Sequence, residues 1–334
     1  MPTRIADIYE PEPYGRMINE KQLELNRYFG SGIMIRDAEI ETKLSSGGRT
    51  VEFAGFKPIE NVEPNISNDD PNDFAVPNKA QTQKLQARSA DLNQAWSNMD
   101  LATQLSLPNP EEHIIGSIAG YWRTANERRL IHSTLGVLNA NALNNQGDMQ
   151  IDIALDDPGQ ASAAEKLNKE VVIEAAQTMG DHKDGLNYIV MHSRVNANLA
   201  IVEKNSFDKE SVGDVKVPTY LGMRVIIDDS MPAIQGTNRL SYLSVVFAPS
   251  AFGYGEGYVK VPSEYERVPL AGKGGGQENL ISRENVIIHP YGFKYTDAVR
   301  AGDSTSLAEL QNAANWERVW LRKHIGMAFI TTNG

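Results

Sequence analysis

The sequence predicts a protein of the α+β class, and three stretches of the chain carry that prediction. Residues 109–145 repeat apolar side chains at helical spacing over an unusual length. Before them, residues 56–80 contain four prolines and show no helical period. After them, helix and strand patterns alternate, which is typical of an α/β unit. We therefore expect one long helix, one long excursion of the chain and one α/β domain.

The residues before the excursion and directly after it predict a mixture of short elements. Residues 1–15 carry three prolines and no periodic pattern, so we expect an extended arm. A short amphipathic helix is predicted at 16–29, because Gly30 follows its apolar positions. The pattern predicts strands at 33–44 and 50–53 and a helix at 81–105.

The excursion at residues 56–80 has two interpretations. Connections longer than about 15 residues are uncommon in compact domains unless they bind something or are disordered. One interpretation is a mobile surface insertion. The other is an arm that packs on a neighbouring subunit, because the stretch holds more apolar side chains than a pure linker needs. The candidate intersubunit contacts are Phe53, Phe56, Ile59, Val62, Ile66, Phe74 and Val76.

The long helix has recognisable ends. Asn109 can cap the first turn, and Pro110 suits the first helical position. Asn145 and Gly147 mark the end. At a rise of about 1.5 Å per residue the rod is roughly 50 Å long, so it spans more than one ordinary core. Its apolar positions recur mostly at spacings of three and four: Ile114, Ile118, Tyr121, Ala125, Ile131, Leu135, Leu138 and Ala142.

The α/β unit follows the long helix. Ser162 and Glu165 match a capping box. We expect, in order, a helix at 163–179, a strand at 188–191, a helix at 193–201 and strands at 223–228, 240–247, 258–261, 280–289 and 292–295. Residues 272–276 predict a flexible tip because four of the five are glycine. A second capping box at Ser306 starts a helix, and 325–331 predicts a last strand.

Composition narrows the class of protein. The chain has 334 residues and 41% hydrophobic content, which suits about two domains with sizeable cores. It contains no cysteine, which excludes disulfides and thiolate chemistry. No apolar run is long enough for a membrane helix or a signal peptide, so we expect a soluble cytosolic product. Lys plus Arg number 32 and Asp plus Glu 43, and the net charge of −11 disfavours a dedicated nucleic-acid reader.

The search for catalytic, cofactor or metal motifs finds none. The glycines of residues 253–257 lack the third glycine and the following helix of a dinucleotide turn. The six histidines show no metal-ligand spacing. The pairs Asp69-Asp70, Asp156-Asp157 and Asp228-Asp229 are expected to form turns, and Arg128-Arg129 to lie on a solvated helix face or in an ion pair. We therefore expect no enzyme and no cofactor.

Four strings of residues, together with the order of the parts, resemble the major capsid proteins of tailed bacteriophages, which have the Hong Kong 97 type fold. The shared order is an arm, a Pro-rich excursion, a long spine helix, an α/β domain and a C-terminal return. The strings are TYLGMRVIIDDSMP at 219–232, APSAFGYGEG at 248–257, HPYGFKY at 289–295 and ANWERV at 314–319.

The resemblance implies a division of the chain and an assembly function. It implies an N-terminal arm at 1–44, an extended loop at 45–88, a peripheral domain at 89–160 with the spine helix at 109–145, an axial domain at 161–275, and a return to the peripheral domain at 276–334. Copies of the chain would form homo-hexamers and homo-pentamers. These would close into an icosahedral virion capsid around double-stranded DNA, and the acidic lining would let the genome slide.

The resemblance also implies partners. Only about 45 residues precede the extended loop. This is too few for the fused scaffolding domain of some relatives, so we expect a separate scaffolding protein. A portal and a decoration or cement protein are further implied partners, no membrane is implied, and assembly would take place in the host bacterial cytoplasm. No Lys and Asn pair matches a motif for the covalent crosslinking known in the family.

Three alternatives to a phage capsid stay open on the sequence. An encapsulin-like nanocompartment shell would share the fold and enclose an enzyme. A virion adhesin or decoration protein would be a binding module, although repetitive β structure would then be expected. An enzyme that uses the scattered carboxylates is the third.

Overall fold

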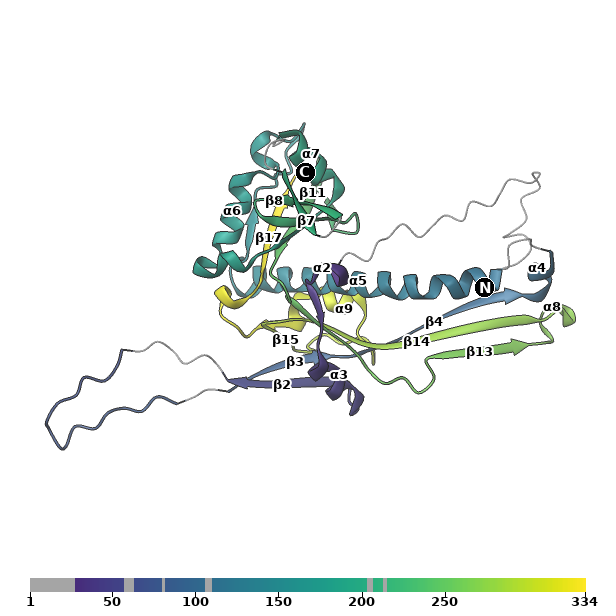
Figure 1. Cartoon of the computed structure of the whole chain (residues 1–334), viewed down its shortest axis with the longest axis horizontal. Helices are drawn as coiled ribbons and strands as arrows, with labels where there is room; N and C mark the ends of the chain where they lie inside the picture. Colours follow the sequence, from purple (N-terminus) through teal and green to yellow (C-terminus); the bar gives the residue numbers. More distant parts are fainter. Residues whose placement is uncertain (1–27, 57–62, 80–81, 106–109, 203–206, 213–214) are drawn as a thin grey trace.

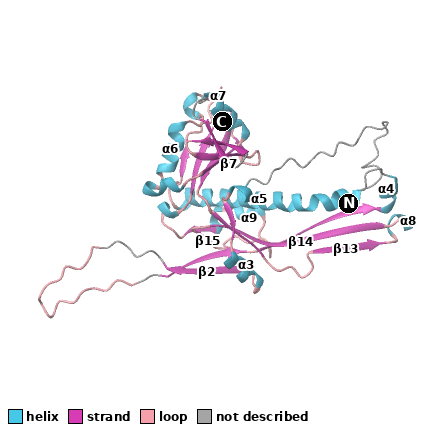
Figure 2. Ribbon diagram, in the orientation of Figure 1, coloured by secondary structure: helices cyan, strands magenta, loops and turns pink. Residues whose placement is uncertain are grey.

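The computed structural model describes residues 28–56, 63–79, 82–105, 110–202, 207–212 and 215–334. Its longest element is the helix α5 (Pro110–Asn144), which crosses the molecule horizontally in Figure 1. The α/β unit lies above one half of α5, and a long sheet runs beside the other half (Figures 1 and 2). The predicted arm at 1–15, most of the predicted helix at 16–29 and the predicted cap Asn109 lie outside the described residues.

Helix α5 confirms the predicted spine helix. Its end is closed by Gln146 and Gly147, which both have positive φ angles, and the N–H of Gly147 donates to the carbonyl of Asn141. Ile131, Leu135 and Leu138 of the predicted stripe are buried, whereas Ala142 is exposed. Between residues 126 and 141 the helix is buried around most of its circumference. The single stripe read from the sequence therefore understates its burial.

The α/β unit contains eight strands and two helices among the described residues. The helices are α6 (Lys169–Gln177) and α7 (Ser193–Val202). The strands are β5 (Gln150–Asp152), β6 (Tyr188–Met191), β7 (Phe207–Val212), β8 (Val215–Tyr220), β9 (Met223–Ile227), β10 (Ala233–Gln235), β11 (Leu240–Phe247) and β17 (Met327–Thr332). Their order is β5-β17-β11-β6-β9-β8-β7, with β10 on one end of β11.

The central strands of this sheet are buried on both faces. In β6, Tyr188 and Val190 join the core around α5, while Ile189 and Met191 join the core of α6 and α7. Alternate side chains of a strand point to opposite faces, so both cores are supplied by one strand. This double burial explains why residues 188–191 form an uninterrupted apolar run.

The distal sheet is built around one long strand, β14 (Gln277–Pro290). On one side β14 pairs with β4 over residues 277–286. On its other side it pairs first with β13 and then with β12, and β1 adds to β12 in parallel. The short helix α8 joins β13 to β14 and overlaps the glycine-rich tip predicted at residues 272–276. The bounds are β1 (Met34–Arg36), β4 (Ala90–Met99), β12 (Phe252–Glu256), β13 (Ser263–Val268) and α8 (Ala271–Gly274).

The remaining elements form the extended hairpin and the contacts beneath α5. The hairpin pairs β2 (Thr50–Phe56) with β3 (Thr82–Arg88) and projects from the body with the 63–79 loop at its far end (Figure 1). The other elements are α2 (Tyr28–Ser31), α3 (Ala38–Ser45), α4 (Asp100–Leu105), β15 (Phe293–Tyr295), α9 (Leu307–Gln311), β16 (Trp316–Arg318) and the 3₁₀ turns η1 (Ala163–Glu165), η2 (Gly180–Gly185), η3 (Ala313–Asn315) and η4 (Arg322–His324).

Helix α9 packs against α5 at Gly136. A Cβ atom on Gly136 would overlap the carbonyl oxygen of Leu310 and the indole ring of Trp316. The indole Nε1 of Trp316 donates to that same carbonyl at 2.7 Å. Glycine is therefore needed here for the close approach of the two elements and not for its backbone freedom.

The strand predicted at residues 33–44 is wrong beyond Arg36, because α3 occupies most of it. Asp37 caps this helix by accepting from the N–H of Glu39 at 2.8 Å. Ile40 and Leu44 lie one turn apart, and both are buried in a small core with Val51, Ala87 and Ile287. A spacing of four fits a helix as well as a strand, and the cap decides between them.

The helix predicted at residues 81–105 is also wrong, except for α4 at its end. The stretch forms β3 and β4, and β4 pairs with β14 along its whole length. Leu85, Leu92, Trp96 and Met99 have helical spacing, but the pairing with a distant strand overrides that local preference.

One further predicted strand is absent, and one predicted helix begins later than expected. Residues 258–261 form no strand and connect β12 to β13. In the helix predicted at 163–179, the capping box closes only the turn η1, and α6 begins at Lys169 with Asn168 as its cap. The predicted strands at 50–53, 188–191, 223–228, 240–247, 280–289, 292–295 and 325–331, the helix at 193–201 and the capping box at Ser306 are confirmed within one to three residues at each end.

Tyr28 ties the start of the described chain to the α/β unit. Its ring is fully buried, and its hydroxyl donates to Asp228 Oδ2 at 2.8 Å. Replacing Tyr28 by phenylalanine leaves that buried carboxylate oxygen without this donor, so we expect unfolding free energy to fall by about 1 to 3 kcal/mol. Urea denaturation at pH 7 measures the change. Tyr258, whose side chain is exposed, supplies the control Tyr258→Phe. Equal midpoints for the two variants would contradict the role given to Tyr28.

Candidate assembly surfaces

The acidic pairs of the sequence serve structural roles. At the end of β9, Asp228 holds Tyr28, and Asp229 accepts from the N–H of Ser193 at 3.1 Å, at the start of α7. Asp156 accepts three backbone N–H groups, those of residues 237–239, at 2.7 to 2.9 Å. These bonds, led by that of Asn238, lower the pKa of Asp156. Asp156 therefore holds the turn at residues 237–239, and Asp229 stabilises the start of a helix, which the sequence analysis did not predict.

The described part of the chain shows no metal-binding arrangement. No group of three or more His, Cys, Asp or Glu side chains among these residues could hold a metal ion. His289 is buried and donates from Nε2 to the carbonyl of Phe293 at 2.8 Å, which gives it a packing role. His182 and His324 lie edge to face with ring centres 5.5 Å apart on the turns η2 and η4.

A membrane-crossing helix is also missing from the described residues. None of their helices has both the length and the hydropathy that a crossing requires.

The loop at the end of the extended hairpin presents apolar side chains to solvent. Ile66 is 85% exposed, Phe74 81% and Val76 71%. The loop has a defined turn, because Asp70 accepts from the N–H of Asn72 at 2.9 Å and its carbonyl accepts from the N–H of Asp73. Every residue from 63 to 79 is exposed. Covering these apolar side chains with another protein surface would lower the free energy of the system, because it removes apolar area from water.

The other four candidate contacts have different surroundings. Phe53 is half-buried against the small core of its own subunit, and the Nζ atom of Lys43 lies 4.7 Å from its ring centre. Phe56 ends β2 opposite Thr82. Ile59 and Val62 lie outside the described residues. The structure thus brings Ile66, Phe74 and Val76 to one exposed loop and places Phe53 at the base of the hairpin.

A second apolar surface lies at the opposite end of the molecule, and the sequence analysis missed it. There the first turns of α5 run beside the distal sheet, and their side chains are only partly covered. Ile115 is 56% exposed, and Tyr265 on β13 is 51% exposed. Arg123 is exposed two turns along α5 from Ile115. No local signal marks this surface, because it depends on α5 and β13 lying together.

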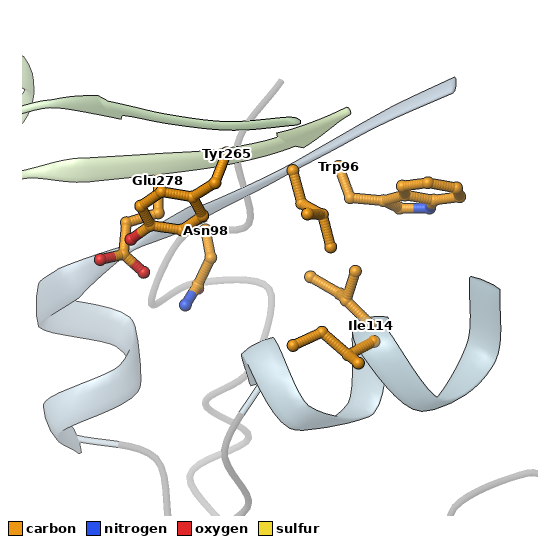
Figure 3. A pocket seen from close by; sticks show the side chains of 7 residues that line it. Trp96, Asn98, Ile114, Tyr265 and Glu278 are labelled. Carbon is orange, nitrogen blue, oxygen red and sulfur yellow. The ribbon is translucent and has the colours of Figure 1, made fainter. Parts of the chain in front are cut away.

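A small hollow opens within this second surface (Figure 3). Trp96 and Asn98 reach it from β4, Tyr265 and Glu278 from β13 and β14, and Ile114 from α5. Leu280 and Ile115 complete its lining. The walls are mostly apolar, so the hollow suits an apolar side chain.

Comparisons with known proteins agree on one class. The description "Major capsid protein 13-like" belongs to a family that matches residues 109–325. The chain is 32% identical to the major capsid protein of Bacillus phage SPP1 over 327 residues, which covers 97% of this chain and 96% of that protein.

Solved structures with the same fold include phage capsids. The capsid of Ralstonia phage GP4 aligns with a TM-score of 0.64 at 8% identity, over 97% of this chain and 96% of that one. The capsid of cyanophage Pam1 aligns with a TM-score of 0.59 at 11% identity, over the same shares. The head of Helicobacter pylori bacteriophage KHP40 aligns with a TM-score of 0.54 at 9% identity, over 99% and 97%. The α+β fold is therefore the Hong Kong 97 type that the motifs implied, and the chain belongs to the major capsid protein 13-like family.

Proposed function

We propose that copies of this chain assemble through homo-hexamers and homo-pentamers into the icosahedral head shell of a phage, around double-stranded DNA. One observation carries the proposal beyond family membership. The exposed loop of the hairpin and the uncovered surface of α5 and β13 lie at opposite ends of an elongated molecule (Figure 1). Two different surfaces that meet head to tail generate a ring when the rotation closes.

The two surfaces complement each other in chemistry. The loop offers Ile66, Phe74 and Val76 beside the acidic residues Asp69 and Asp70. The second apolar surface offers the hollow of Figure 3, whose lining also includes Glu278. Burying the loop against a neighbouring subunit would remove apolar area from water. The interface would join the loop of each subunit to the second apolar surface of the next.

Deleting residues 56–76 is expected to leave a folded subunit that no longer forms shells. The described residues 63–76 of this stretch are all exposed and belong to neither of the two large cores. Size exclusion with light scattering, and negative-stain images of the void fraction, measure assembly. A deletion variant that still forms normal shells would refute the intersubunit role of the loop.

A triple variant separates side-chain contacts from loop length. In Ile66→Ser, Phe74→Ser and Val76→Ser together, the loop keeps its length and turn but loses its apolar surface. We expect shells to disappear or to need a higher protein concentration. Leu143→Ser is the matched control, because Leu143 is 70% exposed at the far end of α5.

The proposed shell needs partners beyond the chain itself. We propose a scaffolding protein, a portal and a decoration or cement protein, with assembly in the host bacterial cytoplasm and a structural role without catalysis. DNA would be held by proximity, since the chain carries a net charge of −11. Co-purification of unassembled subunits with the scaffolding protein of the same genome tests the first of these partners. Absence of a complex would count against it.

We propose the domain division 1–44, 45–88, 89–160, 161–275 and 276–334, with four strands reassigned. β12 and β13 pair with β14 of the distal sheet, so we assign both to the peripheral domain. β17 pairs with β11 and β5, so we assign β17 and β5 to the axial domain.

A further inference from the structure

Residues 297–305 connect β15 to α9, and they are held from two sides by arginine side chains. On one side lies the base of the extended hairpin, which supplies Arg49 and Arg88. On the other side lies the spine helix α5, which supplies Arg129. Residues 297–305 thus lie between the base of the hairpin and the spine helix, and they contact both.

The hairpin side of this contact is a buried guanidinium. The side chain of Arg88 is 2% exposed and forms an ion pair with Asp297. Its Nη2 atom also donates to the carbonyls of Gly302 and Asp303, each at 3.0 Å. Arg49 forms an ion pair with the Asp303 carboxylate. One planar side chain therefore contacts both ends of the segment, a geometry that a lysine could not reproduce.

The spine side is a second buried guanidinium. Arg129 donates from Nη1 to the carbonyl of Thr305 at 2.8 Å, and from Nη2 to the Thr305 hydroxyl. Burial lowers the pKa of Arg129 to about 10. If Thr305 moved away, the buried guanidinium of Arg129 would lose two hydrogen-bond acceptors, which is costly. The position of Thr305 is therefore strongly constrained.

The segment itself is braced between these contacts. Val299 exchanges two hydrogen bonds with the side chain of Asn315, at 2.7 and 3.0 Å. The N–H of Ala301 donates to Glu309 at 2.6 Å. A braced segment transmits a displacement at one end to the other, whereas a slack loop would absorb it.

The hairpin is also attached to the body by an apolar core, a lysine contact and a strand connection. Val51 and Ala87 pack with Ile40, Leu44 and Ile287 in the small core, and apolar contact is non-directional. Lys43 Nζ donates to the carbonyl of Glu52 at 2.7 Å, and β3 continues through one residue into β4, which pairs with β14. Charge-assisted hydrogen bonds are directional, so the buried arginine contacts restrict the angle of the hairpin in addition to these attachments.

We infer that residues 297–305 are a latch that fixes the direction of the extended hairpin relative to the spine helix. Arg88 and Arg129 are its two buried arginine attachments, and release of either one lets the hairpin change direction. If the hairpin carries the intersubunit contact proposed above, the latch sets the angle at which each subunit reaches its neighbour. The latch itself is a property of the single subunit and does not depend on that proposal.

Distance measurement on unassembled subunits tests the latch. The chain has no cysteine, so Thr82→Cys on β3 and Ala142→Cys on α5 would carry the only two spin labels. In the doubly labelled chain with no other change, we expect a narrow distribution of the distance between the two labels. With Arg88→Met added, we expect a distribution about twice as broad, because the hairpin is then free to hinge. Arg283→Met is the matched control, because Arg283 pairs with Glu264 in the distal sheet, away from the segment.

Thr305→Val is the decisive variant, because the hydrogen bonds described for Thr305 join it to Arg129 of the spine helix and not to the hairpin. A latch requires this change also to broaden the distance to the hairpin, whereas a merely local role of Thr305 would leave it unchanged. Circular dichroism establishes that each variant is folded. An unbroadened distribution in folded Thr305→Val would overturn the inference, and so would one in Arg88→Met. If Arg88→Met does not fold, the exposed pair Arg49→Gln with Asp303→Asn replaces it under the same criterion.

Discussion

Replacing Gly136 by alanine is expected to lower the free energy of unfolding by roughly 3 to 5 kcal/mol. The new methyl group would occupy the space of the Leu310 carbonyl and the Trp316 indole, and Trp316 is itself 2% exposed. Either α9 moves away from α5 or the indole leaves its position, and both break the hydrogen bond from Trp316 Nε1. The cost combines overpacking with an unpaired buried donor and acceptor.

Gly116 provides the matched control on the same helix. A Cβ atom on Gly116 meets nothing within 4 Å, so Gly116→Ala gains helix propensity without any clash. We expect it to stabilise the chain by about 0.5 to 1 kcal/mol. Chemical denaturation of both variants measures the two effects, which have opposite signs. A Gly136→Ala variant as stable as Gly116→Ala would show that α9 does not pack on α5 as described.

Acidification is expected to destabilise the fold through His289. Burial lowers the pKa of this histidine from 6.5 to about 4. The folded state therefore keeps the ring neutral where the unfolded chain already binds a proton, so this contribution is complete above pH 6.5 and decreases as the pH falls toward 4. At 1.36 kcal/mol per pH unit the loss reaches roughly 3 kcal/mol at pH 4.

A comparison of variants isolates this contribution from that of other groups. Burial raises the pKa of Glu284 to about 7, which acts in the opposite direction between pH 4.5 and 7. In His289→Gln the amide can still donate to Phe293. The ring's stacking on Trp316 is lost at every pH, and the pH-dependent part of the difference comes from its titration. The stability difference between wild type and His289→Gln should change by roughly 3 kcal/mol from pH 7 to pH 4, in favour of the variant. Leu143→Ser, which replaces an exposed side chain and removes no titratable group, should show no such change. A difference independent of pH would mean that His289 is not buried as a neutral ring.

Local signals explain which elements the sequence predicted well. The spine helix has a proline start, a periodic interior and a glycine end, all within one stretch, so α5 was predicted almost to the residue. The capping box at Ser306 was equally local and is confirmed for α9. β4 was missed because its strand character comes from β14, which is distant in the sequence.

The same distinction applies to the assembly surfaces. Ile66, Phe74 and Val76 were predicted as contacts because they are apolar residues in a stretch without a core to join, and they are exposed. That they contact a neighbouring subunit stays a prediction. Phe53 packs on its own subunit because α3 carries Lys43 and Ile40 to it, and α3 was read as a strand. The hollow of Figure 3 could not be predicted, since its lining comes from four separate elements.

The place of β17 in the α/β sheet has a consequence for the synthesis of the protein. β17 lies between β5 and β11, in the interior of the sheet, although the ribosome makes it long after both of them. A chain that is released before Met327 lacks an interior strand and leaves β5 and β11 without their common partner. Such truncated products cannot complete the α/β sheet, so premature termination yields chains that cannot reach this fold. Formation of the complete sheet therefore depends on translation of the chain through β17.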